Sequence, residues 1–309
     1  MNIVMFGKGN PDYLHDMLYH GFRQLGHTVL DLPRKPNLHA PRGEEGLLKL
    51  HWDEQEIKGP TGLMLVCAMP ADFGPDASAY KSRLLDALVR YNPSKIALVD
   101  GSDLAVPHPD YAGPFDAVFK RELLKGDPQP ANWHNLPFAA FPEVLVLPYK
   151  GYKNIDVLYM GSVSCQPFRV RVLQELTDFA SRNSLVTACS LDPVSRDTYL
   201  ELVRRSKVVV SVRGYGWDCY RYWETPALGA VMVTEDIPIH FENDFVDGVD
   251  CFKFATGDTM DMQRKLVQAL SLSDADREKI GINAWYRTKK MHTPLNRAKF
   301  VIEKVFGGN

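Results

Sequence analysis

The chain has 309 residues, a length that corresponds to about two domains. Lys and Arg total 36 and Asp and Glu total 38, so the net charge is −2. Residues 1–150 carry a net −3 and residues 151–309 a net +1. This balance excludes a protein that holds nucleic acid mainly through a broad positive field, and leaves room only for a local basic groove.

Cysteine usage and hydropathy narrow the class of protein further. The five cysteines are widely spaced and show no C-x-x-C pair, which does not fit a disulfide framework or a zinc site. No apolar run reaches the ~18 residues that a membrane span needs. The first residues lack the basic segment and long apolar stretch of a signal peptide. We therefore expect a cytoplasmic, two-domain protein with no membrane span.

The first half of the chain predicts a parallel sheet covered by helices. Residues 2–6 are a short apolar run, and apolar residues at helical spacing over 12–25 predict a helix that Gly26 ends. This strand–helix alternation implies βαβ units. Residues 31–60 are polar and irregular, and a loop of that length is usually functional or mobile. The further elements predicted for this half are strands at 27–30, 63–67, 95–99 and 116–119 and a helix at 80–91.

The second half predicts another α/β series of similar size. Residues 126–153 are rich in Pro and Asn, and we interpret them as the tail of the first domain and its linker. The predicted domains are therefore 1–150 and 151–309. Two such sheets bind ligands at the carboxyl ends of their strands, so we expect a cleft between them. The predicted elements are strands at 155–160, 185–189, 207–212 and 230–234, and helices at 168–179, 196–205, 220–228, 258–271, 274–289 and 294–306.

A Gly-Lys-Gly turn follows the first strand. Gly7 and Gly9 let backbone approach a ligand closely, and the helix that follows favours a negative charge at its start. A dinucleotide fingerprint would need glycine where Asp12 stands, so the turn is not one. A tight turn without a ligand is the alternative interpretation.

Two further strands of the first half end in charged residues. Asp100 and Asp103 follow the strand at 95–99, where a carboxylate can act as a base or accept a hydrogen bond from a hydroxyl group. Arg121 follows the strand at 116–119 and suits a phosphate or carboxylate. Turn chemistry for the aspartates and a surface ion pair for Arg121 are the alternatives.

The densest signal lies at 211–230, where a strand runs into a glycine loop and then a helix. The loop around Gly214 presents free N–H groups to an anion, and Arg213 and Arg221 can neutralise a diphosphate. Glu224 lies one turn into the helix, where its carboxylate can accept two ribose hydroxyls. Stabilisation of the helix dipole is the alternative for Glu224, and core packing is the alternative for the aromatic residues beside it.

Residues 155–255 resemble the nucleotide-sugar-binding domain of GT-B glycosyltransferases, and are most similar to the spore-maturation-type, glycosyltransferase family 1-like proteins. The resemblance rests on the sequences at 156–162 and 221–235 and on Arg169. It implies that Glu224 holds the donor ribose and that the turn after the strand at 155–160 lies by the donor diphosphate. The expected donor-binding residues are Gly161, Ser162, Arg169, Arg213, Gly214, Arg221, Tyr222 and Glu224.

The resemblance implies an α/β GT-B fold with two facing Rossmann-like domains, an interdomain cleft, and a last helix that packs back toward the first domain. The implied activity is hexosyl transfer from a nucleoside-diphosphate sugar, most simply a UDP-sugar, to an acceptor hydroxyl. Fixed N–H groups and arginines can stabilise the leaving diphosphate, so we expect no metal and no cofactor. Asp103, or else Asp100, is the expected base if the enzyme inverts. The E-x7-E pattern of many retaining members would need Glu at position 216, which is Gly216, so the stereochemistry stays open.

The acceptor also stays open. A glycan, a protein, a small molecule or a hydroxymethylated DNA base all fit, and Arg34, Lys35 and Arg42 in the long loop can supply a local basic groove. Two other functions are alternatives to a glycosyltransferase. One is a non-catalytic GT-B-like nucleotide-binding or scaffold protein, and the other is a Rossmann oxidoreductase, which the broken fingerprint at Asp12 disfavours.

Overall fold

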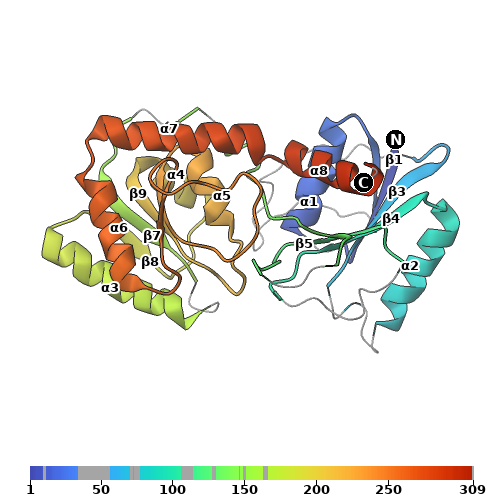
Figure 1. Cartoon of the computed structure of the whole chain (residues 1–309), viewed down its shortest axis with the longest axis horizontal. Helices are drawn as coiled ribbons and strands as arrows, with labels where there is room; N and C mark the ends of the chain where they lie inside the picture. The colour runs from blue at the N-terminus through green and yellow to red at the C-terminus, as the bar shows by residue number, and fades with distance from the viewer. Residues whose placement is uncertain are drawn as a thin grey trace. The chain divides into compact units, whose positions relative to one another are not determined.

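The chain forms two compact units, which Figure 1 shows. The first comprises Met1–Ala139 and Pro294–Asn309, and the second comprises Ala140–Thr293. The computed structural model describes residues 1–9, 12–33, 56–69, 72, 77–105, 114–126, 130–145, 147–148, 151–162 and 166–307. Arg34, Lys35 and Arg42 lie outside the described residues. The first unit therefore ends eleven residues before the predicted domain boundary at 150 and includes the last helix.

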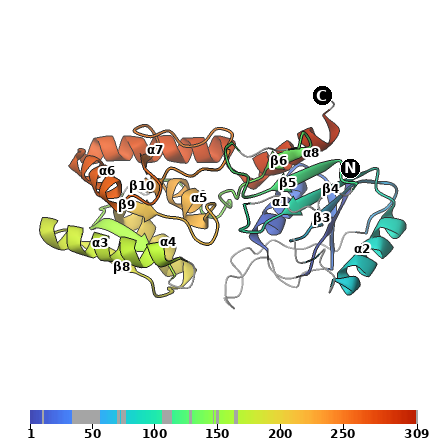
Figure 2. The ribbon, with the colours of Figure 1, turned by 60° about the horizontal axis from the view of Figure 1, so that its bottom comes forward.

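The first unit is built on a six-stranded parallel sheet (Figure 2). Its strands are β1 (Asn2–Phe6), β2 (Thr28–Leu32), β3 (Thr61–Cys67), β4 (Lys95–Asp100), β5 (Ala117–Lys120) and β6 (Trp133–Asn135). Its helices are α1 (Tyr13–Gln24), α2 (Ser78–Tyr91) and α8 (Pro294–Phe306). The strand order is β2-β1-β3-β4-β5-β6, so the chain moves outward from β1 in both directions.

Alternation along the strands divides the core of this unit into two layers. Val4 and Met64 belong to a buried cluster that includes α2 residues such as Tyr80. On the other face Phe119 of β5 packs against Phe300 of α8, with ring centroids 6.2 Å apart. Helix α8 also lies along α1, as Figure 1 shows. The central strands β1 and β3 are apolar over most of their length because helices cover both faces of the sheet.

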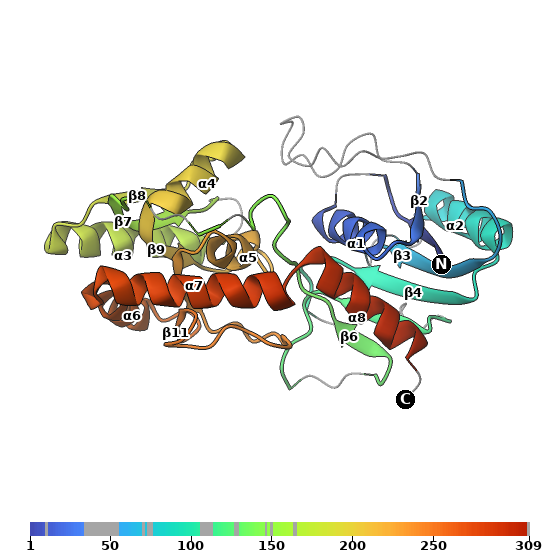
Figure 3. The same ribbon diagram turned by 90° about the horizontal axis from the view of Figure 1, so that it is seen from above.

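The second unit contains a five-stranded parallel sheet. Its strands are β7 (Ile155–Met160), β8 (Thr187–Ser190), β9 (Ser206–Ser211), β10 (Val231–Glu235) and β11 (Phe252–Phe254). Its helices are α3 (Pro167–Asn183), α4 (Arg196–Arg205), α5 (Tyr220–Ala227), α6 (Thr259–Ser271) and α7 (Asp274–Met291). The strand order is β11-β10-β9-β7-β8, and α7 runs alongside α5 (Figure 3).

The structure confirms a two-part α/β fold. Strands β1 and β7 and helix α4 have the predicted bounds, and Ser273 caps α7 by accepting a hydrogen bond from the Asp276 backbone. Strand β6, which lies in the tail of the first unit, and strand β11 are not among the predicted elements. Each has three residues, too few to show the two-residue period by which a strand is recognised. In the ranges that the structure describes, no helix has the length and apolar character that crossing a membrane requires.

Candidate functional site

The topology of the second unit creates a ligand-binding position between β7 and β9. The chain leaves β7 through α3 toward β8 and leaves β9 through α5 toward β10, in opposite directions across the sheet. Because such crossovers are right-handed, α3 and α5 lie on opposite faces and the loops after β7 and β9 diverge. A parallel sheet binds its ligands at this switch point, beyond the carboxyl ends of the strands. Gly161 follows β7 and Arg213 follows β9.

Arg169 of α3 ties these two loops together. Its Nε donates a hydrogen bond to the Arg213 carbonyl oxygen at 2.9 Å, and its Nη1 donates to the Ser162 carbonyl oxygen at 3.5 Å. A Cβ at Gly214 would lie 3.1 Å from Arg169 Nη2, and one at Gly161 would lie 3.5 Å from Arg169 Cδ. The two glycines therefore leave room for a buried guanidinium, and Arg169 fixes the shape of the crevice.

Arg213 presents a positioned positive charge at the same place. Its guanidinium lies over the Trp217 ring, 4.4 Å from the centroid, and 3.8 Å from Glu235 Oε1. The Arg213 backbone N–H donates to Glu235 Oε2 at 2.8 Å. Burial raises the pKa of Glu235, whereas these contacts with Arg213 lower it. Ring stacking and the neighbouring carboxylate hold the guanidinium in place while leaving it partly exposed to a ligand.

Helix α5 brings a second arginine to this edge of the sheet. Cys219 is its N-cap, and the Cys219 side chain does not cap the first N–H groups of the helix, so the helix start remains favourable for an anion. Arg221 Nη2 donates to the Val212 carbonyl oxygen at 3.3 Å. Its Nε is buried and has no partner in the described part of the chain. An unsatisfied buried donor of this kind suits an acceptor such as a phosphate oxygen.

Glu224 lies one turn further along α5. The residue is 2% exposed, and its Oε1 forms an ion pair with Arg196 at the start of α4. Within the described residues Glu224 makes no other side-chain hydrogen bond, so one carboxylate oxygen is left for a ligand. The ion pair with Arg196 orients the Glu224 carboxylate.

Tyr222 and Trp223, between these polar residues, belong to the core. Both are fully buried, Tyr222 donates its hydroxyl to Asp244, and Trp223 Nε1 donates to Asp218 at 2.6 Å. The packing alternative therefore describes Tyr222 as well as Trp223. Tyr222 supports the site through the aromatic cluster behind α5 rather than through an exposed group.

Two charged residues that the sequence does not single out complete this cluster. Arg196 is the partner of Glu224, and Glu143 lies in electrostatic reach of both. Burial raises the pKa of Glu143 to about 7, and Glu224 adds to the rise while Arg196 opposes it. Arg196 lies outside every motif identified in the sequence, and Glu143 lies in the segment 126–153, interpreted as the tail of the first domain and its linker. Neither gives a signal in the sequence alone.

The first unit has an equivalent switch point between β1 and β3. A cavity of about 230 Å³ lies there, lined by Gly7, Lys8, His15 and Gly101 among others. Lys8 forms an ion pair with Asp72 at 2.5 Å. Gly9 has φ +82, and a Cβ there would lie 2.7 Å from Pro33 Cγ, so glycine is needed for this turn.

The two candidate bases of the first unit differ in access. Asp100 is fully buried, accepts a hydrogen bond from Lys120 Nζ at 2.7 Å, and accepts another from the Ser102 backbone N–H at 2.8 Å. The Asp103 side chain is 48% exposed and pairs with Arg121. Asp103 is therefore the accessible carboxylate. Arg121 is itself buried, so its ion pair with Asp103 differs from the surface pair given as its alternative role. The Arg121 guanidinium also lies over the Phe138 ring, 4.5 Å from its centroid.

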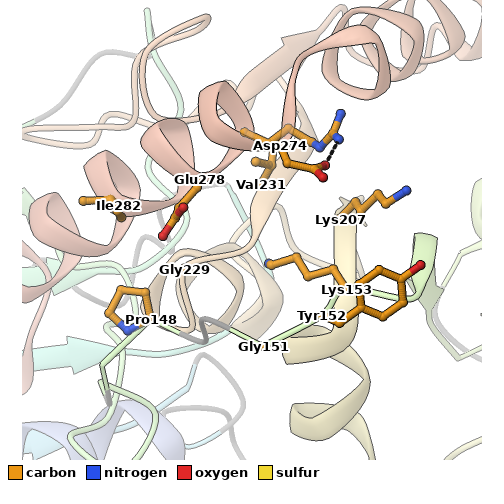
Figure 4. A pocket seen from close by; sticks show the side chains of 11 residues that line it. Pro148, Gly151, Tyr152, Lys153, Lys207, Gly229, Val231, Asp274, Glu278 and Ile282 are labelled. Carbon is orange, nitrogen blue, oxygen red and sulfur yellow. Dashed lines mark hydrogen bonds and ion pairs between the residues drawn. The ribbon is translucent and has the colours of Figure 1, made fainter.

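A second cavity, of about 300 Å³, opens at the amino ends of β7, β9 and β10 (Figure 4). Lys153 and Glu278 reach into it from different elements. Lys153 Nζ donates to the Ser206 carbonyl oxygen at 3.0 Å, and burial lowers the pKa of Lys153 to about 8. This cavity lies at the edge of the sheet opposite Arg213 and Glu235. Among the described residues, no three His, Cys, Asp or Glu side chains are grouped as a metal site requires.

Comparison with known proteins gives a family match for part of the chain and similar structures for the fold. Residues 168–303 match the family described as "Glycosyl transferase-like". A Rickettsia africae glycosyltransferase structure aligns with TM-score 0.62 and 11% identity over 99% of both chains. Anabaena HepE, solved in complex with UDP and glucose, aligns with TM-score 0.59 and 12% identity over 100% of both chains.

A third similar structure is longer than this chain. Staphylococcus aureus TarM, in a complex that contains UDP, aligns with TM-score 0.56 and 11% identity over 79% of this chain. The chain spans about half the length of TarM, 55% of it. No curated protein sequence matches the chain.

Proposed function

Because residues 168–303 match the family described as "Glycosyl transferase-like" and the fold is similar to those of GT-B glycosyltransferases, we propose that this chain is a hexosyltransferase. It moves a sugar from a nucleoside-diphosphate sugar, UDP-sugar foremost, to an acceptor hydroxyl without a metal or cofactor. The observation that carries the proposal is that Arg213, Arg221 and Glu224 all lie on the loop and helix that follow β9, at the switch point of the second sheet. UDP is present in the structures of HepE and TarM to which the fold is similar.

The residues of the second unit suggest how the donor binds. The free oxygen of Glu224 accepts ribose hydroxyls, and Arg213 and Arg221 contact the diphosphate. When the bond between the sugar and the β-phosphate oxygen breaks, negative charge grows on that phosphate. Arginines and N–H groups that are already in place stabilise this charge without reorganising, which is the largest expected contribution to catalysis.

On the acceptor side, Asp103 is the proposed base, because its carboxylate is accessible where Asp100 is buried. A base at this position takes the proton of the acceptor hydroxyl as the new glycosidic bond forms. A glycan, a protein, a small molecule or a hydroxymethylated DNA base remain the acceptor classes. In the same unit Gly7 lines the cavity of about 230 Å³, and Gly9 lies in the turn next to it.

The proposal is tested by calorimetric titration with uridine, guanosine, thymidine and adenosine diphosphates, followed by an assay for hydrolysis of the matching nucleotide-sugars. We expect one nucleotide to bind and its sugar to be released slowly without an acceptor. No binding of any of the four removes the proposal. Binding without hydrolysis or transfer instead identifies a non-catalytic nucleotide-binding protein of the same fold.

A further inference from the structure

Glu143 is anchored beside the donor cluster by the backbone around it. It lies in a turn in which the Val144 N–H donates to the Phe141 carbonyl oxygen at 3.1 Å. Phe141 and Val144 are buried, with 1% and 0% of their surfaces exposed. Phe141 and Val144 fix this turn in the core, and Oε2 of the Glu143 side chain is buried in the protein.

The carboxyl group of Glu143 has an unfilled hydrogen-bonding position. Its Oε2 is buried and has no partner in the part of the chain that the structure describes. The charged groups that face it are Arg196 of α4 and Glu224 of α5. Arg196 is bound to Glu224. The Arg196 guanidinium therefore attracts two carboxyl groups, and Glu224 is the one that forms an ion pair with it.

The proton on Glu143 changes the charge offered to a donor by one. With Glu143 neutral, Arg196 and Arg221 together carry one more charge than Glu224. With Glu143 ionised, the charges of these four side chains sum to zero, so the positive charge near the donor is smaller by one. A nucleoside-diphosphate sugar carries two negative charges, so it is bound more tightly by the first state.

We propose that Glu143 is a positioning residue of the donor site, whose proton decides whether its carboxyl group competes with Glu224 for Arg196. In the protonated state Arg196 holds Glu224 in place for the donor ribose. In the ionised state Glu143 competes for Arg196 and adds a second negative charge, so donor affinity falls. This inference rests on the proposed function, because it assigns the regulation of the same site.

The pKa of Glu143, raised to about 7 by burial, places this change in the physiological range. Donor affinity should be constant below pH 6 and should fall as pH rises through 7. If the donor binds only the protonated form, affinity at pH 8 is about tenfold weaker than at pH 6.

The test is calorimetric titration of UDP-glucose into the full chain between pH 6 and pH 8.5. UDP-glucose is a suitable probe because both of its phosphoryl groups stay ionised across this range. Glu143→Gln should remove the pH dependence and bind at pH 8 as tightly as the wild type does at pH 6. Glu201→Gln, on an exposed position of the same helix α4 as Arg196, is the control and should keep the wild-type dependence.

The outcomes separate the two claims. Wild-type affinity that does not change with pH overturns the inference, even if Glu143→Gln fails to fold. A Glu143→Gln variant that keeps the pH dependence overturns it as well. In both cases the proposed function stands, since the donor still binds. If neither UDP-glucose nor the other nucleotides bind at any pH, the proposed function fails and the inference fails with it.

Discussion

Replacement of Glu143 by glutamine should stabilise the ligand-free protein at high pH and not at low pH. In the folded protein burial raises the pKa of Glu143 from 4.5 to about 7, so the folded state holds a proton that the unfolded state has lost between these values. The free energy of unfolding of the wild type therefore falls as pH rises through this window. Glutamine has nearly the same shape and never ionises, so the variant avoids this loss.

The size of the effect follows from the two pKa values. At about 1.4 kcal/mol for each pH unit between them, the full cost of ionising Glu143 is about 3 kcal/mol. Solvent contact at the partly buried side chain screens the charge, so about 1–3 kcal/mol is expected at pH 8. At pH 4.5 and below, the expected difference is a few tenths of a kcal/mol.

Urea unfolding of the wild type and Glu143→Gln at pH 4.5 and pH 8 measures this difference. The comparison needs no nucleotide, so it tests the buried carboxyl independently of function. Glu201→Gln, which removes an exposed charge from α4, should give the same small difference at both pH values. An equal stability difference for Glu143→Gln at the two pH values would refute the account of a carboxyl destabilised by burial.

The remaining predictions concern stability. Lys153→Met should raise the melting temperature at pH 7, because burial lowers the pKa of Lys153 from 10.5 to about 8 and a charged lysine there is unfavourable. The stability of the wild type should rise toward that of the variant as pH rises from 8 to 10.5. A variant that is less stable than the wild type at pH 7 would contradict this. Gly21→Ala should destabilise the first unit by about 2 kcal/mol or more, because the new Cβ would lie 2.1 Å from the Pro294 carbonyl oxygen and force α8 away from α1. Gly26→Ala is its matched control, with no atom within 4 Å of the new Cβ and only the strain of φ +78, about 1 kcal/mol; equal melting temperatures for the two variants would show that the α1–α8 contact is not tight.

The sequence predicts those parts of the fold that repeat over several residues. The apolar run at 155–160 is buried by helices on both faces of a parallel sheet, so its length alone marks β7. β6, with the sequence Trp-His-Asn, has no such run. It forms because β5 offers an unpaired edge in parallel register, which is a property of the folded sheet and not of three residues.

The candidate site shows the same division. Gly214 and Glu224 are predictable because they stand in one continuous strand–loop–helix segment. Arg196 pairs with Glu224 from 28 residues away, and Glu143 approaches both from a different segment again. Such contacts depend on how α4, α5 and the turn at 142–144 pack, so no local sequence pattern predicts them. Tyr222 shows the reverse case, since its position beside Arg221 and Glu224 suggests a ligand contact while helical geometry turns it into the core.

The most direct measurement of the central claim is the affinity of the matching nucleotide-sugar for the wild type and for Glu224→Ala, at pH 6. Loss of charged hydrogen bonds to the ribose, worth about 1.5–3 kcal/mol, should weaken binding about ten- to a hundredfold, while Glu201→Gln leaves it unchanged. If Glu224→Ala folds and binds the nucleotide-sugar as tightly as the wild type, the crevice beyond β7 and β9 is not where the donor ribose binds.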